Sequence, residues 1–324
     1  MADYKGIKGF TIPSVSSDPD NPIIGQIWYN STSATLKGAG VGVGAWASGG
    51  NINTARNNMA SAGTQTAALC ISGETATNVA NVESYNGSSW TEIADVNDAF
   101  RGLRGCGTST AALECGGYPG MSATTETWDN SSWTEAADLN AGRSGHACAG
   151  TSTAALAFAG EPGSRTENES WNGTSWTELA DLNTGRSNAA GAGSQTAAFC
   201  VSGKTPGDDQ ITNYETWNGT SWTEGADVNT GRQVGGASGT TSLALFFAGA
   251  KAPGETVATE TESFDGTSWT EVGDLSTARW KLGGTGASSS VAIGFAGLAA
   301  GDALSDATEE WNKPDSTTVT VTTS

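Results

Sequence analysis

The sequence WNGTSWTELADLNTGR, residues 171–186, recurs along the chain with small changes and decides the fold. Residues 217–232 read WNGTSWTEGADVNTGR, and residues 264–279 read FDGTSWTEVGDLSTAR. The second Trp of each copy repeats every 43 to 47 residues, at Trp46, Trp90, Trp133, Trp176, Trp222 and Trp269. This spacing indicates six repeats, each built either from paired helices or as a four-stranded propeller blade.

The composition of the repeats favours strands. The chain of 324 residues has 45 Gly and 12 Trp, and no stretch shows an apolar stripe with helical periodicity. In the third repeat, runs bounded by Gly, Pro-Gly or Asn-Gly predict strands at residues 144–150, 153–160, 165–171 and 175–182. We therefore predict an all-β fold, a six-bladed β-propeller of four-stranded blades preceded by a short extended N-terminal segment.

The repeats share a further order of residues. An Arg opens each first strand, at Arg56, Arg101, Arg143, Arg186, Arg232 and Arg279. The apolar second strands end in Gly, at Gly73, Gly116-Gly117, Gly160, Gly203, Gly249 and Gly297, and the third strands contain motifs such as Glu169-Ser170-Trp171. This order resembles the kelch repeat over residues 46–312, although five of the six repeats have one Gly where kelch usually has two. The resemblance implies a kelch-like propeller but says little about function.

A residue that recurs in every repeat is expected to support the frame. We expect each Arg to bond strand carbonyls or the acidic residue five positions earlier, namely Asp138, Asp181, Asp227 or Asp274. The alternative is that the six Arg side chains form an anion site at the channel mouth. The repeated carboxylates are also expected in the frame, where burial would require N–H or Arg partners. They are Glu126, Glu169, Glu215 and Glu262.

The chain divides into three segments. Residues 1–45 are predicted to be a docking and linker segment, residues 46–314 the propeller, and residues 315–324 a C-terminal strand or tail. The strand around Trp46 is expected to complete the sixth blade, because Trp311 is not followed by the second Trp of the other repeats. The alternating stretch TTVTVTT, residues 317–323, competes for the same place.

The N-terminal segment carries its own motif. Residues 25–38, GQIWYNSTSATLKG, alternate like a two-stranded hairpin. They resemble a short module near the N-termini of tail-fibre and other virion proteins of bacteriophages, in which G-x-I-W-Y-N is followed by a hydrophobic residue and Lys. The resemblance implies that Ile27, Trp28 and Tyr29 dock the protein to other virion proteins. It implies a location in the virion, after assembly in the bacterial cytoplasm.

Charge and cysteine content exclude several classes of protein. The net charge of −19 argues against nucleic acid and anionic membranes as partners. Residues 1–10, MADYKGIKGF, do not resemble a signal peptide, and no apolar run is long enough for membrane insertion. The five Cys include no CxxC spacing and are expected to be buried free thiols. Cys106 and Cys115 could alternatively face each other across a hairpin.

The repeats differ most in the loop after the second-strand Gly, so ligand binding is expected there. The candidate binding residues are Tyr118, Met121, Arg165, Lys204, Asp208, Asp209, Lys251 and Asp302. The expected ligand is a host cell-surface glycan or protein, and the chain could form a homo-oligomer.

Few residues suit catalysis. The single His146 is expected to be a packed residue, which argues against His-rich metal sites and a Ser-His-Asp triad. We predict no catalytic residue, metal or cofactor, and a virion protein of a tailed phage that serves as a tail-fibre, appendage or receptor-binding module. The alternatives are a capsid decoration or head-fibre protein, an intracellular kelch-like adaptor, and a carbohydrate-active enzyme. The enzyme would use Asp208, Asp209, Asp302 or Asp306.

Overall fold

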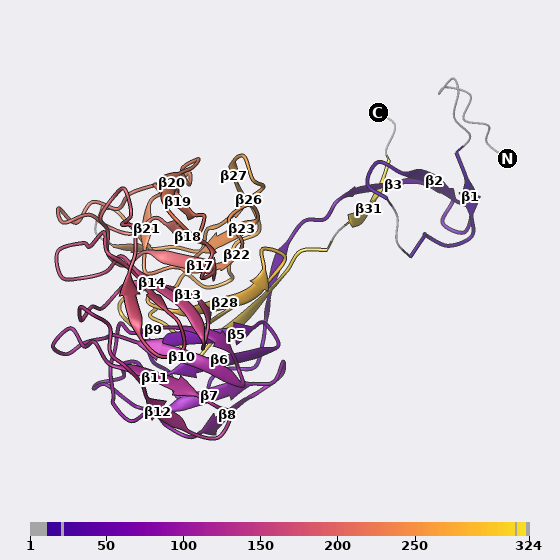
Figure 1. The fold of residues 1–324 in the computed structure, drawn as a ribbon. Coiled ribbons are helices and arrows are strands. Elements are labelled where there is room, and N and C mark those ends of the chain that lie inside the picture. The colour runs from indigo at the N-terminus through magenta and orange to yellow at the C-terminus, as the bar shows by residue number, and fades with distance from the viewer. Residues whose placement is uncertain (1–11, 21–22, 254, 315, 322–324) are drawn as a thin grey trace. The chain divides into compact units, whose positions relative to one another are not determined.

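The computed structural model describes residues 12–20, 23–253, 255–314 and 316–321 (Figure 1). All regular elements in these ranges are strands, and no helix that could cross a membrane occurs among them. The strands form eight sheets of three or four strands, paired antiparallel except for β1 with β2. The chain separates into unit 1, Met1–Gly44 with Lys313–Ser324, and unit 2, Ala45–Asn312. The prediction of an all-β fold is confirmed for the described residues.

Unit 2 contains six four-stranded sheets and a three-stranded sheet within the described ranges. The first three sheets are β5 (Ala60–Thr64), β6 (Ala67–Ile71), β7 (Val82–Tyr85) and β8 (Trp90–Ile93); β9 (Arg104–Thr108), β10 (Ala111–Cys115), β11 (Thr125–Trp128) and β12 (Trp133–Glu135); and β13 (Ala147–Thr151), β14 (Ala154–Phe158), β15 (Asn168–Trp171) and β16 (Trp176–Glu178). The next three are β17 (Ala190–Ser194), β18 (Ala197–Val201), β19 (Tyr214–Trp217) and β20 (Trp222–Glu224); β22 (Gly236–Gly239), β23 (Ala244–Phe247), β26 (Thr261–Phe264) and β27 (Trp269–Glu271); and β28 (Gly283–Ser288), β29 (Val291–Phe295), β30 (Thr308–Asn312) and β4 (Ala45–Ser48). The three-stranded sheet consists of β21 (Arg232–Gln233), β24 (Ala250–Lys251) and β25 (Thr256–Val257).

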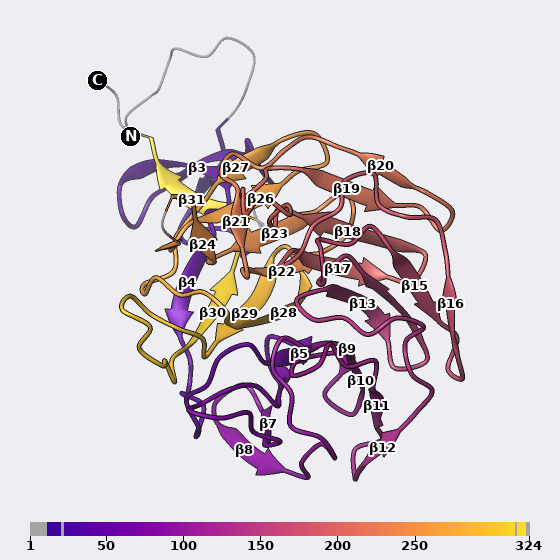
Figure 2. The same cartoon turned by 90° about the vertical axis from the view of Figure 1, so that its left-hand side faces the viewer.

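The four-stranded sheets have a propeller-like arrangement. Their first strands, β5, β9, β13, β17, β22 and β28, contact one another in a closed cycle. In Figure 2 these strands lie nearest the centre, whereas β8, β12, β16, β20 and β27 lie at the periphery. Each sheet therefore presents its first strand to the middle of unit 2 and its fourth strand to the outside.

A ring of backbone hydrogen bonds joins the segments that lead into the first strands. Each of six residues donates its N–H to the carbonyl of the equivalent residue in the preceding repeat, with N–O distances of 2.7 to 3.0 Å, and the sixth closes back on the first. All six have positive φ, between 49° and 68°. The residues of this backbone ring are Asn58, Gly102, Gly145, Asn188, Val234 and Lys281.

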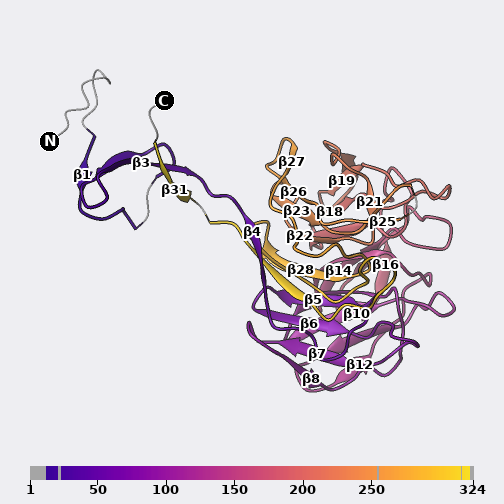
Figure 3. The same cartoon turned by 180° about the vertical axis from the view of Figure 1, so that it is seen from behind.

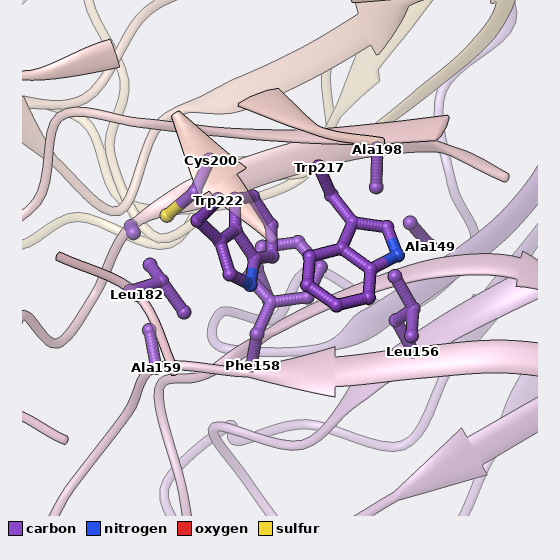
Figure 4. Close-up of a cluster of buried hydrophobic side chains, with 11 residues drawn as sticks. Ala149, Leu156, Phe158, Ala159, Leu182, Ala198, Cys200, Trp217 and Trp222 are labelled. Atoms are coloured by element: carbon purple, nitrogen blue, oxygen red, sulfur yellow. The ribbon is translucent and has the colours of Figure 1, made fainter. Parts of the chain in front are cut away.

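Aromatic side chains fill the space between adjacent sheets. Trp217 and Trp222, from the β17–β20 sheet, pack against Leu156 and Phe158 of β14 in the preceding sheet (Figure 4). The ring centroids of Phe158 and Trp222 lie 4.9 Å apart, and both side chains are buried. Because a buried aromatic removes roughly 150–250 Å² from water, these contacts supply much of the hydrophobic stabilisation between sheets.

The strands of the third repeat are shorter than predicted. We expected residues 165–171 and 175–182, but β15 and β16 span only Asn168–Trp171 and Trp176–Glu178. Beyond Glu178 the pairing continues only through isolated bonds, from Leu179 N–H to Asn168 O and from Leu182 N–H to Thr166 O. The sequence pattern therefore predicted longer strands than the regular hydrogen bonding between β15 and β16 supports.

The last sheet of unit 2 combines residues from both ends of the unit. Strand β4 pairs with β30, with Trp46 opposite Trp311, and Figure 3 shows the indigo β4 beside the yellow strands of this sheet. The competing stretch, residues 317–323, contributes instead to β31 (Ser316–Thr320) in unit 1, and residues 322–323 lie outside the described ranges.

Unit 1 is a sheet in the order β1 (Ser14–Val15), β2 (Ile27–Asn30), β3 (Thr35–Val41) and β31. The predicted hairpin is confirmed, because β2 and β3 pair antiparallel. Asp18 accepts hydrogen bonds from Lys37 Nζ at 2.6 Å, Asn30 Nδ2 at 2.7 Å and Trp28 Nε1 at 3.0 Å. These bonds, led by that from Lys37, lower the pKa of Asp18 to about 2.

Candidate functional site

Most of the repeated Arg residues support the frame of unit 2. The guanidinium of Arg186 is buried and pairs with Glu215 on the third strand of its sheet. It also donates to Asn213 O at 2.8 Å and to Thr184 O at 3.1 Å, while Glu215 accepts two bonds from Asn183. The same pairing occurs in Arg56–Glu83, Arg143–Glu169, Arg232–Glu262 and Arg279–Glu309.

The acidic partner differs from the one predicted. We expected Arg186 to bond strand carbonyls or Asp181, five positions earlier. Asp181 is exposed and accepts instead from Thr166 Oγ1 at 3.0 Å. The buried Arg points inward, where only the third-strand carboxylate is within reach. Asp138, Asp227 and Asp274, the other predicted acidic partners, form no ion pair with the Arg five positions later among the described residues.

The second repeat departs from this frame. Phe100 stands ten residues after Trp90, where the other repeats have Arg, so including Arg101 among the frame residues was wrong. Arg101 lies one position farther along, pairs with Glu74 at 2.5 Å, and places its guanidinium 4.6 Å from the ring centroid of Tyr118. The extra residue therefore moves a cation from the interior to the loop face.

Loss of the buried Arg coincides with a second buried carboxyl group. Glu114 lies opposite Glu126 in the β10–β11 register, is fully buried, and has no hydrogen-bond partner for either oxygen. Burial, followed by the charges of Glu126 and Asp98, raises the pKa of Glu114 well above its ordinary value. Cys70 and Cys200 occupy the equivalent position in two other repeats.

The buried thiols and the histidine also lie near this sheet. All five Cys are free and buried, as predicted. His146 is buried as well, and its Nε2 lies 3.4 Å from Cys115 Sγ. Burial, followed by the charges of Arg143 and Arg104, lowers the pKa of His146 well below its ordinary value. Within the described ranges, no group of three or more His, Cys, Asp or Glu side chains is arranged to hold a metal ion.

The variable loops surround a pocket of about 370 Å³, which we call the loop-face pocket. Residues from all six repeats line it, including members of the backbone ring. The lining side chains that carry charge or an aromatic ring are Arg101, Tyr118, Glu161, Lys204, Glu255, Trp280 and Lys281.

Interactions between the lining side chains organise the pocket. Lys204 Nζ lies 2.7 Å from Asp208 Oδ1 and 4.0 Å from Glu161 Oε1. Gln233 Nε2 donates to Glu255 Oε1 at 3.0 Å. The pocket therefore combines aromatic surface with donors and acceptors of both charges, which suits a polar ligand with many hydrogen-bonding groups.

The predicted binding residues separate into two sets. Tyr118, Met121 and Lys204 line the loop-face pocket, and Asp208 joins them through its ion pair with Lys204. Four do not line it: Arg165, Asp209, Lys251 and Asp302. Of these, Arg165 pairs with Glu167, and Lys251 pairs with Glu260.

Several lining residues were missed because they adjoin the repeated Arg, outside the loops in which ligand binding was expected. Gln233 and Trp280 each follow that Arg directly, and Lys281 follows Trp280. The signal was present in the sequence, since the residue after the Arg varies between repeats. If Phe100 is aligned with the repeated Arg, then Arg101 occupies the variable position directly after it, like Gln233 and Trp280.

The predicted docking residues differ in exposure. Trp28 is fully buried in unit 1, Tyr29 is half-buried, and Ile27 is 38% exposed. Ile23 and Ile24 are more exposed, at 77% and 55%. Unit 1 thus presents isoleucine side chains, whereas Trp28 stabilises its interior.

Neither a protein-family model nor a curated protein matches the chain.

Proposed function

We propose that unit 2 is a six-bladed kelch-like propeller and that the protein is a non-catalytic attachment module of a tailed-phage virion. The loop-face pocket carries this proposal, because variable loops from four repeats and the backbone ring of all six line one site. A constant frame with one variable face is the arrangement by which repeat proteins bind ligands. The buried Arg–Glu pairs are engaged within the frame, so recognition is assigned to the loops.

The proposed ligand is a host-surface glycan. Tyr118 is 41% exposed and offers apolar surface beside the guanidinium of Arg101, and Lys204 lines the same pocket. Gln233 adds an amide, and Ser144 adds a hydroxyl. Sugar rings present both hydroxyl groups and apolar faces, so they can use both kinds of group at once. A surface protein is the alternative ligand.

Binding can be tested with two arginine variants. We expect Arg101→Ala to weaken binding to purified host-surface polysaccharide at least tenfold, a change of about 1.4 kcal/mol. Arg165→Ala is the matched control because its guanidinium lies outside the pocket, and its affinity should equal that of the wild type. Isothermal titration calorimetry gives both values. Equal losses in the two variants would contradict the assignment of the pocket.

Docking through unit 1 is a separate part of the proposal. It is supported by the resemblance of residues 25–38 to virion modules and by the exposed Ile23, Ile24 and Ile27. Deletion of residues 1–38 should abolish incorporation into particles. Unit 2 should remain folded in this variant, as judged by its circular-dichroism spectrum. Quantitative blotting of purified particles measures incorporation, and undiminished incorporation would refute docking by this segment.

A further inference from the structure

The centre of unit 2 holds the two cations of this unit that have no acidic partner. In the described part of unit 2, nine Lys and Arg side chains lie in ion pairs with carboxylates. Only Arg104 and Lys281 do not. Both line a partly open cavity of about 400 Å³ between the first strands of the six four-stranded sheets. Two unpaired cations in one cavity are unexpected in a chain with a net charge of −19.

The rest of the cavity wall offers no compensating negative charge. Its lining is dominated by Gly and Ala, with the thiols of Cys106 and Cys148 and the hydroxyls of Ser61 and Thr285. No Asp or Glu belongs to the lining. Arg104 and Lys281 are therefore the charged side chains of the described lining, in contrast to the acidic character of the chain as a whole.

Arg104 is poorly satisfied by the protein. The hydrogen bond that its guanidinium makes runs from Nη1 to the carbonyl of Leu103, at 2.9 Å. A guanidinium has five N–H donors, so most of the hydrogen-bonding capacity of Arg104 is unused. The side chain of Arg104 is half-buried, and desolvation without a counter-charge lowers its pKa to about 10.

Lys281 lies at one end of this cavity. It belongs to the backbone ring, and it lines both the central cavity and the loop-face pocket, as do Asn58 and Val234. Its Nζ lies 4.1 Å from the centroid of the Trp280 ring, which provides a cation–π contact but no negative charge. The two cations therefore come from different repeats and line the same cavity.

We propose that the central cavity is a binding site for a small oxyanion, a carboxylate or phosphate group, with Arg104 as its principal contact and Lys281 as a second cation. A planar guanidinium can hold either group through two parallel N–H···O bonds. The cavity is large enough for a small molecule that bears such a group. The site shares Lys281 with the loop-face pocket, but its principal contact, Arg104, lines the central cavity and not that pocket. The proposal does not depend on the function proposed for the loop face.

The test uses the full chain and three probes. Inorganic phosphate and glucuronate supply the two anionic groups, and glucose is the neutral control for glucuronate. In calorimetric titrations we expect saturable binding of phosphate, glucuronate or both, with no binding of glucose. Binding of phosphate alone identifies a phosphate ligand, and binding of glucuronate alone identifies a carboxylate. Absence of saturable binding for both anions would overturn the proposal.

Two substitutions separate the site from general charge effects. Arg104→Met should weaken anion binding at least tenfold, whereas Arg165→Met removes the same charge at a paired position and should leave the affinity unchanged. Equal affinity in the wild type and Arg104→Met would also overturn the proposal. Loss of folding is not expected in Arg104→Met, because the change removes a half-buried cation that has no acidic partner. Its melting temperature without anion should equal or exceed that of the wild type, and added anion should raise only the wild-type value.

Discussion

Replacement of Arg186 by Met is expected to lower the free energy of unfolding of unit 2 by about 3 to 5 kcal/mol. The guanidinium is buried against Glu215 and strand carbonyls, so its loss leaves a carboxylate inside without its counter-charge. The remaining bonds from Asn183 compensate only in part. Urea denaturation followed by Trp fluorescence measures the change, because Trp side chains occur in each of the six four-stranded sheets of unit 2.

The control for this prediction is Arg165→Met. Arg165 pairs with the partly exposed Glu167, so its loss should change stability by about 1 kcal/mol or less. The double variant Arg186→Met/Glu215→Gln should be more stable than the sum of the single changes predicts, because no unpaired charge then remains in the interior. Similar losses for Arg186→Met and Arg165→Met would contradict a structural role for the buried pair.

The opposite sign is expected at Glu114, where the frame lacks its Arg. Glu114→Gln should make the protein more stable than the wild type, by an amount that grows as the pH rises above 4.5, the ordinary pKa of this carboxyl group. Below that pH the group is neutral in both the folded and unfolded states. Above it, the unfolded chain releases the proton while the folded chain keeps it, so wild-type stability falls by about 1.4 kcal/mol per pH unit up to the raised folded pKa.

Denaturation midpoints measured between pH 5 and 8, about the range in which most proteins are stable, test this difference. The matched control is Glu215→Gln, the same substitution at a carboxylate that has its Arg partner. This variant should be less stable than the wild type at neutral pH. A stability difference between Glu114→Gln and the wild type that stays constant with pH would show that Glu114 is ionised in the folded protein.

The acidic partner of Arg186 illustrates where sequence patterns fail, although the expected bonds to strand carbonyls are confirmed. Asp181 and Arg186 recur together, so local spacing favoured the Asp, yet the Arg pairs with Glu215, which lies just before the next copy of the motif. Because both acidic residues, Asp181 and Glu215, recur in the repeats, recurrence alone cannot show which of them pairs with the Arg. The choice is made by the direction of the buried side chain, which depends on how the segment packs against β19.

The second repeat shows a different failure. One extra residue places Phe100 at the Arg position and moves Arg101 to the loop face, where it meets Tyr118. We counted Arg101 with the frame because its identity matched, although its position did not. The consequence, an unpaired Glu114 opposite Glu126, becomes visible only from the strand register.

By itself, the sequence determined the repeat spacing, the all-β class, the hairpin of residues 25–38 and the burial of the thiols. These features follow from local signals, because turn residues, apolar runs and composition act over a few neighbouring residues. Only the tertiary structure decided that Arg104 and Lys281, 177 positions apart, line one cavity without an acidic partner. Whether two charged side chains meet depends on the distances across the closed cycle of first strands. No local sequence pattern encodes those distances.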